Sequence, residues 1–441
     1  MTLLSKPLTD EQKESTYKRI LELGVLSVLV QNCVLLAEPE LMSQCVGGDP
    51  KQVAGAMALS SSVSGVIEFL VNPLLGKMAD QYGRKFIYYL GPTLSGAMNL
   101  ALVVNGGKSL NMVIASRTLN WSLISISNSF IGPICMSDMF SGQELGIRVA
   151  KFFGSFGLPV IFAPAIATSI QQATGSAMNV FKIRLLFCMA QLFHIHFLVP
   201  ETLLEERKRS FDISAVNPFA FLKLFGTWST KSLRTLVTVL FLNMLAEGKN
   251  LIPLMQTWAK TQPLWWSPAQ TAASTAAYGT FMVGSGMIAA PKLIKTLGAR
   301  GFTSLACMMN AIGFSVMNLG MPNFAAAYWL GLVFHFLGIN NNSASAVKAM
   351  CTDHAVANGL GRGEYGGMAS SLRSVALIVS PALCNWAYRP SKTTGSKSRP
   401  GYPYFMLAFV AAALPELLHR SLSDAEIENP KKAEEPAGAK A

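Results

Sequence analysis

Several ionisable residues lie inside long apolar runs of this sequence, and four of them are candidates for chemistry: Glu68, Arg117, Glu247 and Arg373. A charge in a run that crosses a bilayer is unfavourable by about 2.5–3.5 kcal/mol on insertion scales, so such side chains are rarely without a role. An acid shielded from water can take up and release a proton as its surroundings change. Glu68 is therefore the main candidate for proton coupling, and Arg373 is a candidate partner for an anionic group.

Three of these four residues also have a structural interpretation. Arg117 could be held for packing, with its charge extended toward the membrane surface. Glu68 could be permanently paired with Arg117 or another base. Glu247 could line a cavity or meet interfacial water, and its place toward the outer half of its run slightly favours the water.

The composition indicates an integral membrane protein. Of the 441 residues, 51% are hydrophobic and 14% are charged, and the mean hydropathy is +0.37, outside the usual range of soluble globular proteins. The net charge of +12 could suggest nucleic acid, but the basic residues lie in short loops between apolar runs. We expect contact with the lipid bilayer, a monomer and no nucleic-acid partner.

No pattern in the sequence indicates an enzyme, a cofactor or a metal site. The seven cysteines have no paired spacing, and there is no Gly-x-x-x-x-Gly-Lys-Ser/Thr loop for a nucleotide. A nucleophile paired with a base is also missing.

Twelve apolar segments must position these residues, and each is close to the roughly 20 residues that a spanning helix needs. They lie at 20–37, 54–75, 86–105, 110–133, 149–172, 180–199, 233–255, 268–291, 301–319, 323–347, 364–388 and 402–418. The predicted domains are an N-terminal segment 1–19, a six-helix half 20–200, a linker 201–232, a second half 233–418 and a disordered tail 419–441.

The distribution of Lys and Arg predicts the orientation. With the N-terminus inside, the cytoplasmic segments hold 22 of these residues and the outer loops hold 7. Since basic residues favour the cytoplasmic side, both termini are predicted to be cytoplasmic. The last outer loop, which carries four basic residues, is an exception that this argument does not explain.

The two predicted halves repeat at nearly one offset. Asp138 and Asp353 are 215 residues apart, and Pro164 and Pro381 are 217 apart. Nearly the same spacing relates Gly83-Arg84 to Gly298-Ala299-Arg300. It also relates Pro200-Glu201-Thr202-Leu203-Leu204 to Pro415-Glu416-Leu417-Leu418. Four pairs in order indicate a duplicated six-helix unit.

A polar loop of ten residues, 76–85, separates the second and third segments. Gly76 is expected to end a helix and to allow close backbone approach, and Gly83 to permit a turn with positive φ. Asp80 is expected to meet the positive end of a neighbouring helix, and Arg84 and Lys85 to hold the loop at the anionic cytoplasmic surface. An ordinary tight connection is the alternative.

The pattern Gly-x-x-x-Asp-x-x-Gly-Arg-Lys resembles the loop signature between the second and third helices of the major facilitator superfamily. That resemblance implies an all-α membrane fold with 12 transmembrane helices in two pseudo-symmetric halves. It also implies that the 76–85 loop gates the cytoplasmic side of the two halves. The family usually has a basic residue where this chain has Gln81.

Residues 54–390 most resemble the tetracycline-resistance-like branch of drug:proton antiporters. Arg117 matches the arginine of a fourth-helix motif implicated in proton transfer, and Glu68 matches a position that commonly carries Gln. The fifth segment around Pro164 is similar to the signature Gly-Pro-x-x-Gly with both glycines replaced by alanine. Both Pro164 and Pro381, which ends a similar eleventh-helix stretch, are expected to bend their helices during gating. The acid usual in the first helix of that branch is absent near Leu29.

These observations predict a secondary active transporter that moves a small solute by alternating access, coupled to protons and resembling an antiporter. The alternatives are an uncoupled facilitator with the same fold, and a receptor or scaffold that does not transport.

Overall fold

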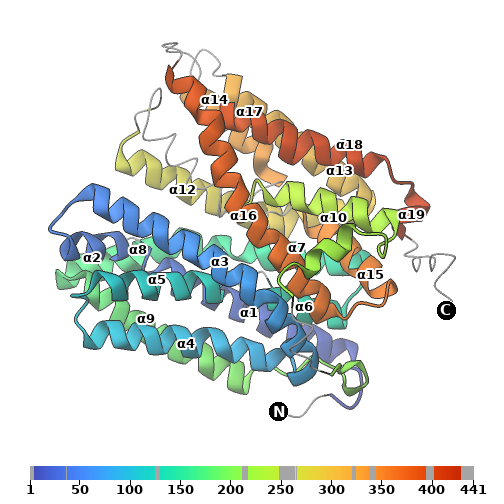
Figure 1. The fold of residues 1–441 in the computed structure, drawn as a ribbon, viewed down its shortest axis with the longest axis horizontal. Coiled ribbons are helices and arrows are strands. Elements are labelled where there is room, and N and C mark those ends of the chain that lie inside the picture. Colours follow the sequence, from blue (N-terminus) through green and yellow to red (C-terminus); the bar gives the residue numbers. More distant parts are fainter. Residues whose placement is uncertain are drawn as a thin grey trace. The chain divides into compact units, whose positions relative to one another are not determined.

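The structure is a computed structural model that describes residues 4–35, 37–124, 130–210, 217–247, 264, 266–319, 324–337, 344–393 and 402–428. The chain is all-α, as expected, and its described residues contain no β-ladder beyond an isolated bridge between Leu4 and Leu204 (Figure 1). It divides into two compact units. Unit 1 comprises Met1–Met139, Ser155–Pro218 and Gly366–Ser374, and unit 2 comprises Phe140–Gly154, Phe219–Tyr365 and Val375–Ala441.

Unit 1 begins with α1 (Asp10–Asn32), whose first turn is closed by a capping box between Thr9 and Gln12. The chain then breaks and continues as α2 (Ala37–Cys45), so the predicted segment 20–37 covers parts of two helices. The remaining helices are α3 (Pro50–Tyr82), α4 (Arg84–Val104), α5 (Leu110–Ile124), α6 (Gly132–Met139), α8 (Gly157–Thr174) and α9 (Ala177–Phe197).

The core of unit 1 joins α2, α4, α5 and α9 through buried apolar side chains that include Leu41, Leu102, Val113 and Phe181. In Figure 1, α4 and α9 run side by side, in agreement with their extensive packing. Polar side chains among these helices are therefore enclosed by apolar neighbours.

Unit 2 contains the second set of helices. They are α7 (Gly142–Ser155), α10 (Lys231–Met244), α12 (Pro268–Val283), α13 (Ala290–Leu319), α14 (Phe324–Phe334), α15 (Ala344–Ala357), α16 (Arg362–Thr393), α17 (Tyr402–Ala408), α18 (Leu414–Arg420) and α19 (Asp424–Glu428). Two π-helical segments, Gly284–Ala289 and Phe409–Ala413, join α12 to α13 and α17 to α18. Residues Gly366–Ser374 of α16 pack in unit 1.

Two glycines bring backbones together in unit 2. A Cβ on Gly154 of α7 would lie 2.6 Å from the Cα of Gly286 and 2.7 Å from the backbone nitrogen of Met287. Only glycine fits where helices approach this closely. The pair fixes α7 against the π-helical segment.

Seven helices of the described residues are long and apolar enough to cross a membrane. Each of the twelve predicted segments overlaps a helix, although the seventh also includes residues 248–255, which are outside the described part; the count of twelve spans stays a prediction. Large apolar side chains such as Phe162, Phe193, Val333 and Phe409 are exposed on these helices. Such surfaces fit a lipid environment, because they would be unfavourable in water.

The predicted linker and tail are partly helical. Linker residues Glu205–Arg207 and Ala220–Phe225 form short 3-10 helices, and residues 211–216 are outside the described part. The tail was expected to be disordered from residue 419, but α18 extends to Arg420 and α19 follows it, with Leu422 and Ile427 buried. Residues 429–441 and most of the basic last outer loop, 394–401, lie outside the described residues.

Candidate functional site

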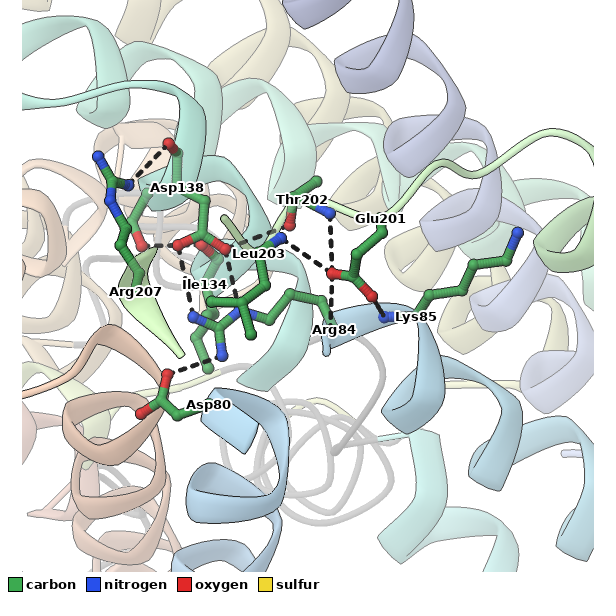
Figure 2. Close-up of polar contacts among 10 residues, drawn as sticks. Asp80, Arg84, Lys85, Ile134, Asp138, Glu201, Thr202, Leu203 and Arg207 are labelled. Atoms are coloured by element: carbon green, nitrogen blue, oxygen red, sulfur yellow. Dashed lines mark hydrogen bonds and ion pairs between the residues drawn. The ribbon is translucent and has the colours of Figure 1, made fainter. Parts of the chain in front are cut away.

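Arg84, the first residue of α4, is the centre of a buried charge cluster (Figure 2). Its Nη1 donates to Asp80 Oδ1 at 2.8 Å, and its Nε donates to Asp138 Oδ2 at 2.9 Å. The Arg84 side chain is 2% exposed, and both carboxylates are also buried. Because Asp80 lies in the last turn of α3 and Asp138 in the last turn of α6, one guanidinium holds three helix ends together. Thr202 Oγ1 also donates to Asp138, at 3.2 Å.

The N-terminus of α4 is capped by a carboxylate from far along the chain. Gly83 has φ of 100° and provides no side-chain cap, so the first N–H groups of α4 need another acceptor. Glu201 fills this role: its Oε1 accepts from Arg84 N at 2.9 Å and its Oε2 from Lys85 N at 3.1 Å. A carboxylate at a helix N-terminus also meets the positive end of the helix dipole. The backbone N–H groups of Thr202 and Leu203 also donate to Glu201 (Figure 2).

This geometry changes two expectations for the 76–85 loop. Arg84 was expected at the membrane surface, but it is buried between two carboxylates, whereas Lys85 donates from its Nζ to the backbone oxygen of His196. Gly76 was expected to end a helix, but α3 continues through it to Tyr82. The expected close approach is present, because a Cβ on Gly367 of α16 would lie 3.4 Å from the Gly76 Cα.

A second buried ion pair joins α2 to α5. Arg117 Nη1 contacts Glu38 Oε2, and Arg117 Nε donates to Ser60 Oγ of α3 at 2.9 Å. The guanidinium also lies over the ring of Trp121, 5.2 Å from its centroid. Both charged side chains are buried. Arg117 therefore has a counter-ion and does not extend to the surface.

A third pair joins α3 to the part of α16 that packs in unit 1. Arg373 Nη1 lies 3.6 Å from Glu68 Oε2, and both side chains are buried. Ser371 Oγ, one helical turn away, donates to the backbone oxygen of Phe69 at 3.5 Å. Glu68 is thus paired with a base, as its structural interpretation allowed, and that base is Arg373 and not Arg117.

The other predicted site residues lie apart from these pairs. Glu247 is buried just beyond the C-terminus of α10, where its backbone N–H donates to Met244 O at 3.1 Å. Pro164 lies inside α8, and Pro381 lies within α16. The backbone oxygen of Pro164 accepts from Thr168 Oγ1 at 2.9 Å, whereas the N–H that Pro164 lacks would have served the backbone oxygen of Val160.

Comparison with known proteins decides the family. The sequence profile of the Major Facilitator Superfamily matches residues 23–381. The chain belongs to the Major Facilitator Superfamily. It is therefore a multi-pass integral membrane protein of a family of transporters, not of enzymes.

Two curated mammalian proteins and two solved structures are similar to this chain. The chain is 23% identical to the mouse Hippocampus abundant transcript-like protein 1 over 75% of its own length, and the match spans 63% of that relative, less than two thirds of it. The human Hippocampus abundant transcript 1 protein is 22% identical over 77% of this chain and 67% of the relative.

The crystal structure of the human organic anion transporter MFSD10 (TETRAN) superposes on this chain with a TM-score of 0.75 at 18% identity. The superposition covers 92% of this chain and 99% of that chain. The proton:xylose symporter XylE superposes with a TM-score of 0.69 at 11% identity, covering 93% and 96%. At these identities the structures share the fold alone.

Three residues of these clusters, and a further buried arginine, are not identified as functional candidates from the sequence alone. Glu38 lies one residue beyond the predicted first segment and was not considered part of a helix. Asp138 and Glu201 were noticed only as markers of the repeat. Arg184 of α9, which is fully buried, was not selected, although it is as strongly embedded in an apolar run as Arg117.

Proposed function

We propose that this protein moves a small solute across the membrane by alternating access and couples the movement to protons through two buried acid–base pairs. The observation that carries the proposal is the coexistence of Glu38–Arg117 and Glu68–Arg373 inside unit 1. Removing two charges from water is unfavourable unless their attraction compensates, so each pair is sensitive to protonation of its acid. Protonating either carboxylate would release its arginine to bind another group.

Alternating access needs contacts that differ between two states, because a ligand shifts an equilibrium only by its differential affinity. We propose that the Arg84 cluster is such a contact, with Gly76, Asp80, Gly83, Arg84 and Lys85 acting in gating. Pro164 and Pro381 would let α8 and α16 bend. Glu247 is retained as a candidate for solute contact.

The named neighbours suggest which solutes to test first. MFSD10 is described as an organic anion transporter and XylE as a proton:xylose symporter. Neither these structures nor the curated relatives support the tetracycline-resistance-like branch, so a tetracycline-like drug has no priority. We also propose a monomer with both termini in the cytoplasm and without nucleic-acid partners.

The test is uptake into proteoliposomes that contain the purified protein, with organic anions, sugars and lipophilic drugs as the solute panel. An imposed pH gradient is expected to drive uptake, and Glu38→Gln and Glu68→Gln are expected to lose the gradient-driven part while exchange without a gradient persists. Glu22→Gln is the matched control, because Glu22 forms an exposed ion pair with Arg19.

Solute flux that is unaffected by both the pH gradient and a protonophore would contradict proton coupling and indicate an uncoupled facilitator. A folded protein without flux of any solute would favour a receptor or scaffold.

A further inference from the structure

Arg184 differs from the other buried arginines of unit 1. Arg84, Arg117 and Arg373 each contact a carboxylate. The Arg184 side chain is 0% exposed, yet no carboxylate of the described residues forms an ion pair with it. Its Nε and Nη1 have no hydrogen-bond partner within that part of the chain, and its Nη2 donates only to Ser95 Oγ, at 3.4 Å.

Ser95 of α4, the acceptor of that hydrogen bond, belongs to a network of neutral polar side chains from α4 and α5. Ser95 Oγ donates to Asn120 Oδ1 at 2.5 Å, and Asn120 Nδ2 donates to Ser116 Oγ at 3.2 Å. Asn99 Nδ2 donates to the backbone oxygen of Phe181, one turn before Arg184, at 2.8 Å. Ser95, Asn99, Ser116, Asn120 and Arg184 form what we name the Arg184 cluster, and all five side chains are buried.

The Arg184 cluster has a positive charge and unpaired donors but no negative charge. A buried charge without a counter-ion is strongly unfavourable, and buried donors are almost always paired. Asn99 Oδ1 also has no partner among the described residues and could accept one N–H, but it is neutral. Water could accept hydrogen bonds as well, without compensating the charge. A small anion would satisfy both needs.

We infer that the Arg184 cluster binds one small monoanion, a carboxylate or a halide, between α4, α5 and α9. The anion could be the carboxylate of a transported solute or a resident inorganic ion such as chloride. The inference rests on the unpaired guanidinium and does not depend on proton coupling. Since the cluster is enclosed, entry of the anion requires these helices to move.

The test is anion binding to the purified full-length protein in detergent. Thermal unfolding midpoints would be measured against sodium chloride, acetate and benzoate, with the larger anion gluconate holding ionic strength constant. Binding of radioactive chloride by scintillation proximity, with acetate and benzoate as competitors, gives a direct reading. We expect saturable stabilisation and saturable chloride binding.

The variants locate the site. Arg184→Gln is expected to weaken binding about 10- to 100-fold, the loss of a charge-assisted hydrogen bond. Arg184→Lys should retain weaker binding, and Asn120→Ala, which keeps the charge, provides a second variant if Arg184→Gln does not fold. Arg148→Gln is the matched control, because Arg148 already pairs with Glu144.

Two further outcomes identify the source of the anion. Competition between chloride and a transported solute would assign the site to the carboxylate of the solute, and chloride binding without effect on flux would assign it to a resident ion. Stabilisation that is equal in the wild type and in Arg184→Gln would be a general salt effect and would overturn the inference. Absence of saturable anion binding to the wild type would do the same.

Discussion

His419 of α18 is a buried histidine whose two ring nitrogens have no hydrogen-bond partner among the described residues. Burial, assisted by the positive charge of Arg300 and opposed by Glu416 and Asp424, lowers the pKa of His419 from 6.5 to about 4. Between these two pH values the unfolded chain binds a proton that the folded chain does not. Stability is therefore complete above pH 6.5 and decreases as the pH falls toward 4.

The expected loss on acidification is about 3 kcal/mol at most, since each pKa unit corresponds to about 1.4 kcal/mol. Thermal unfolding in detergent between pH 7.5 and pH 5 measures it, and His419→Gln should show a shallower pH dependence than the wild type. Some dependence should remain, because burial also lowers the pKa of His354. His196→Gln, at an exposed histidine, should show the same pH dependence of unfolding as the wild type. An unchanged slope in His419→Gln would show that another group controls acid stability.

Among helices, the contact of α7 with the π-helical segment Gly284–Ala289 depends on the absence of side chains. In Gly154→Ala the new methyl group would lie 2.6 Å from the Gly286 Cα, and neither backbone can move without disturbing its helix. We expect a loss of about 1–3 kcal/mol or more, as for other overpacked cores. A lower unfolding midpoint in detergent would report it.

Gly55→Ala in α3 is the control for that substitution. A Cβ at Gly55 has no neighbour within 4 Å, so alanine should be neutral or stabilising by up to about 1 kcal/mol. If both variants unfold like the wild type, the close approach of the two helices is not present in solution.

The positions of helices can be predicted from this sequence better than the contact partners of its polar side chains. Apolar runs and the 76–85 loop were sufficient to place α3, α4 and the turn at Gly83, because these depend on local spacing. The partners of Arg84 could not be derived, since Asp138 is 54 residues away and Glu201 is 117 away. The break between α1 and α2, which brings Glu38 to Arg117, has no strong local signal.

At the scale of the whole molecule, the two sequence repeats share a positive-φ glycine at one corresponding position but differ in the side-chain chemistry around it. Gly83 and Gly298 both have positive φ, 100° and 71°, immediately before a helical stretch. Arg84 is buried between two carboxylates, whereas Arg300 is 29% exposed and pairs at 2.5 Å with Asp424, itself 77% exposed. Asp353, the counterpart of Asp138, instead accepts from the backbone N–H of Gly142 at 2.9 Å, and burial raises the pKa of its carboxyl group.

This asymmetry predicts that equivalent substitutions in the two repeats have unequal effects. Arg84→Gln leaves two buried carboxylates without their cation and should lose about 3–5 kcal/mol. Arg300→Gln breaks an exposed pair and should lose about 0–1 kcal/mol, because water already screens that interaction. Unfolding midpoints of both variants in the same detergent give the comparison, and uptake by each shows whether gating follows stability. Equal losses of stability would contradict this prediction. They would mean that the difference in burial between the two ion pairs does not matter, and that Arg300 stabilises the fold as strongly as Arg84 does.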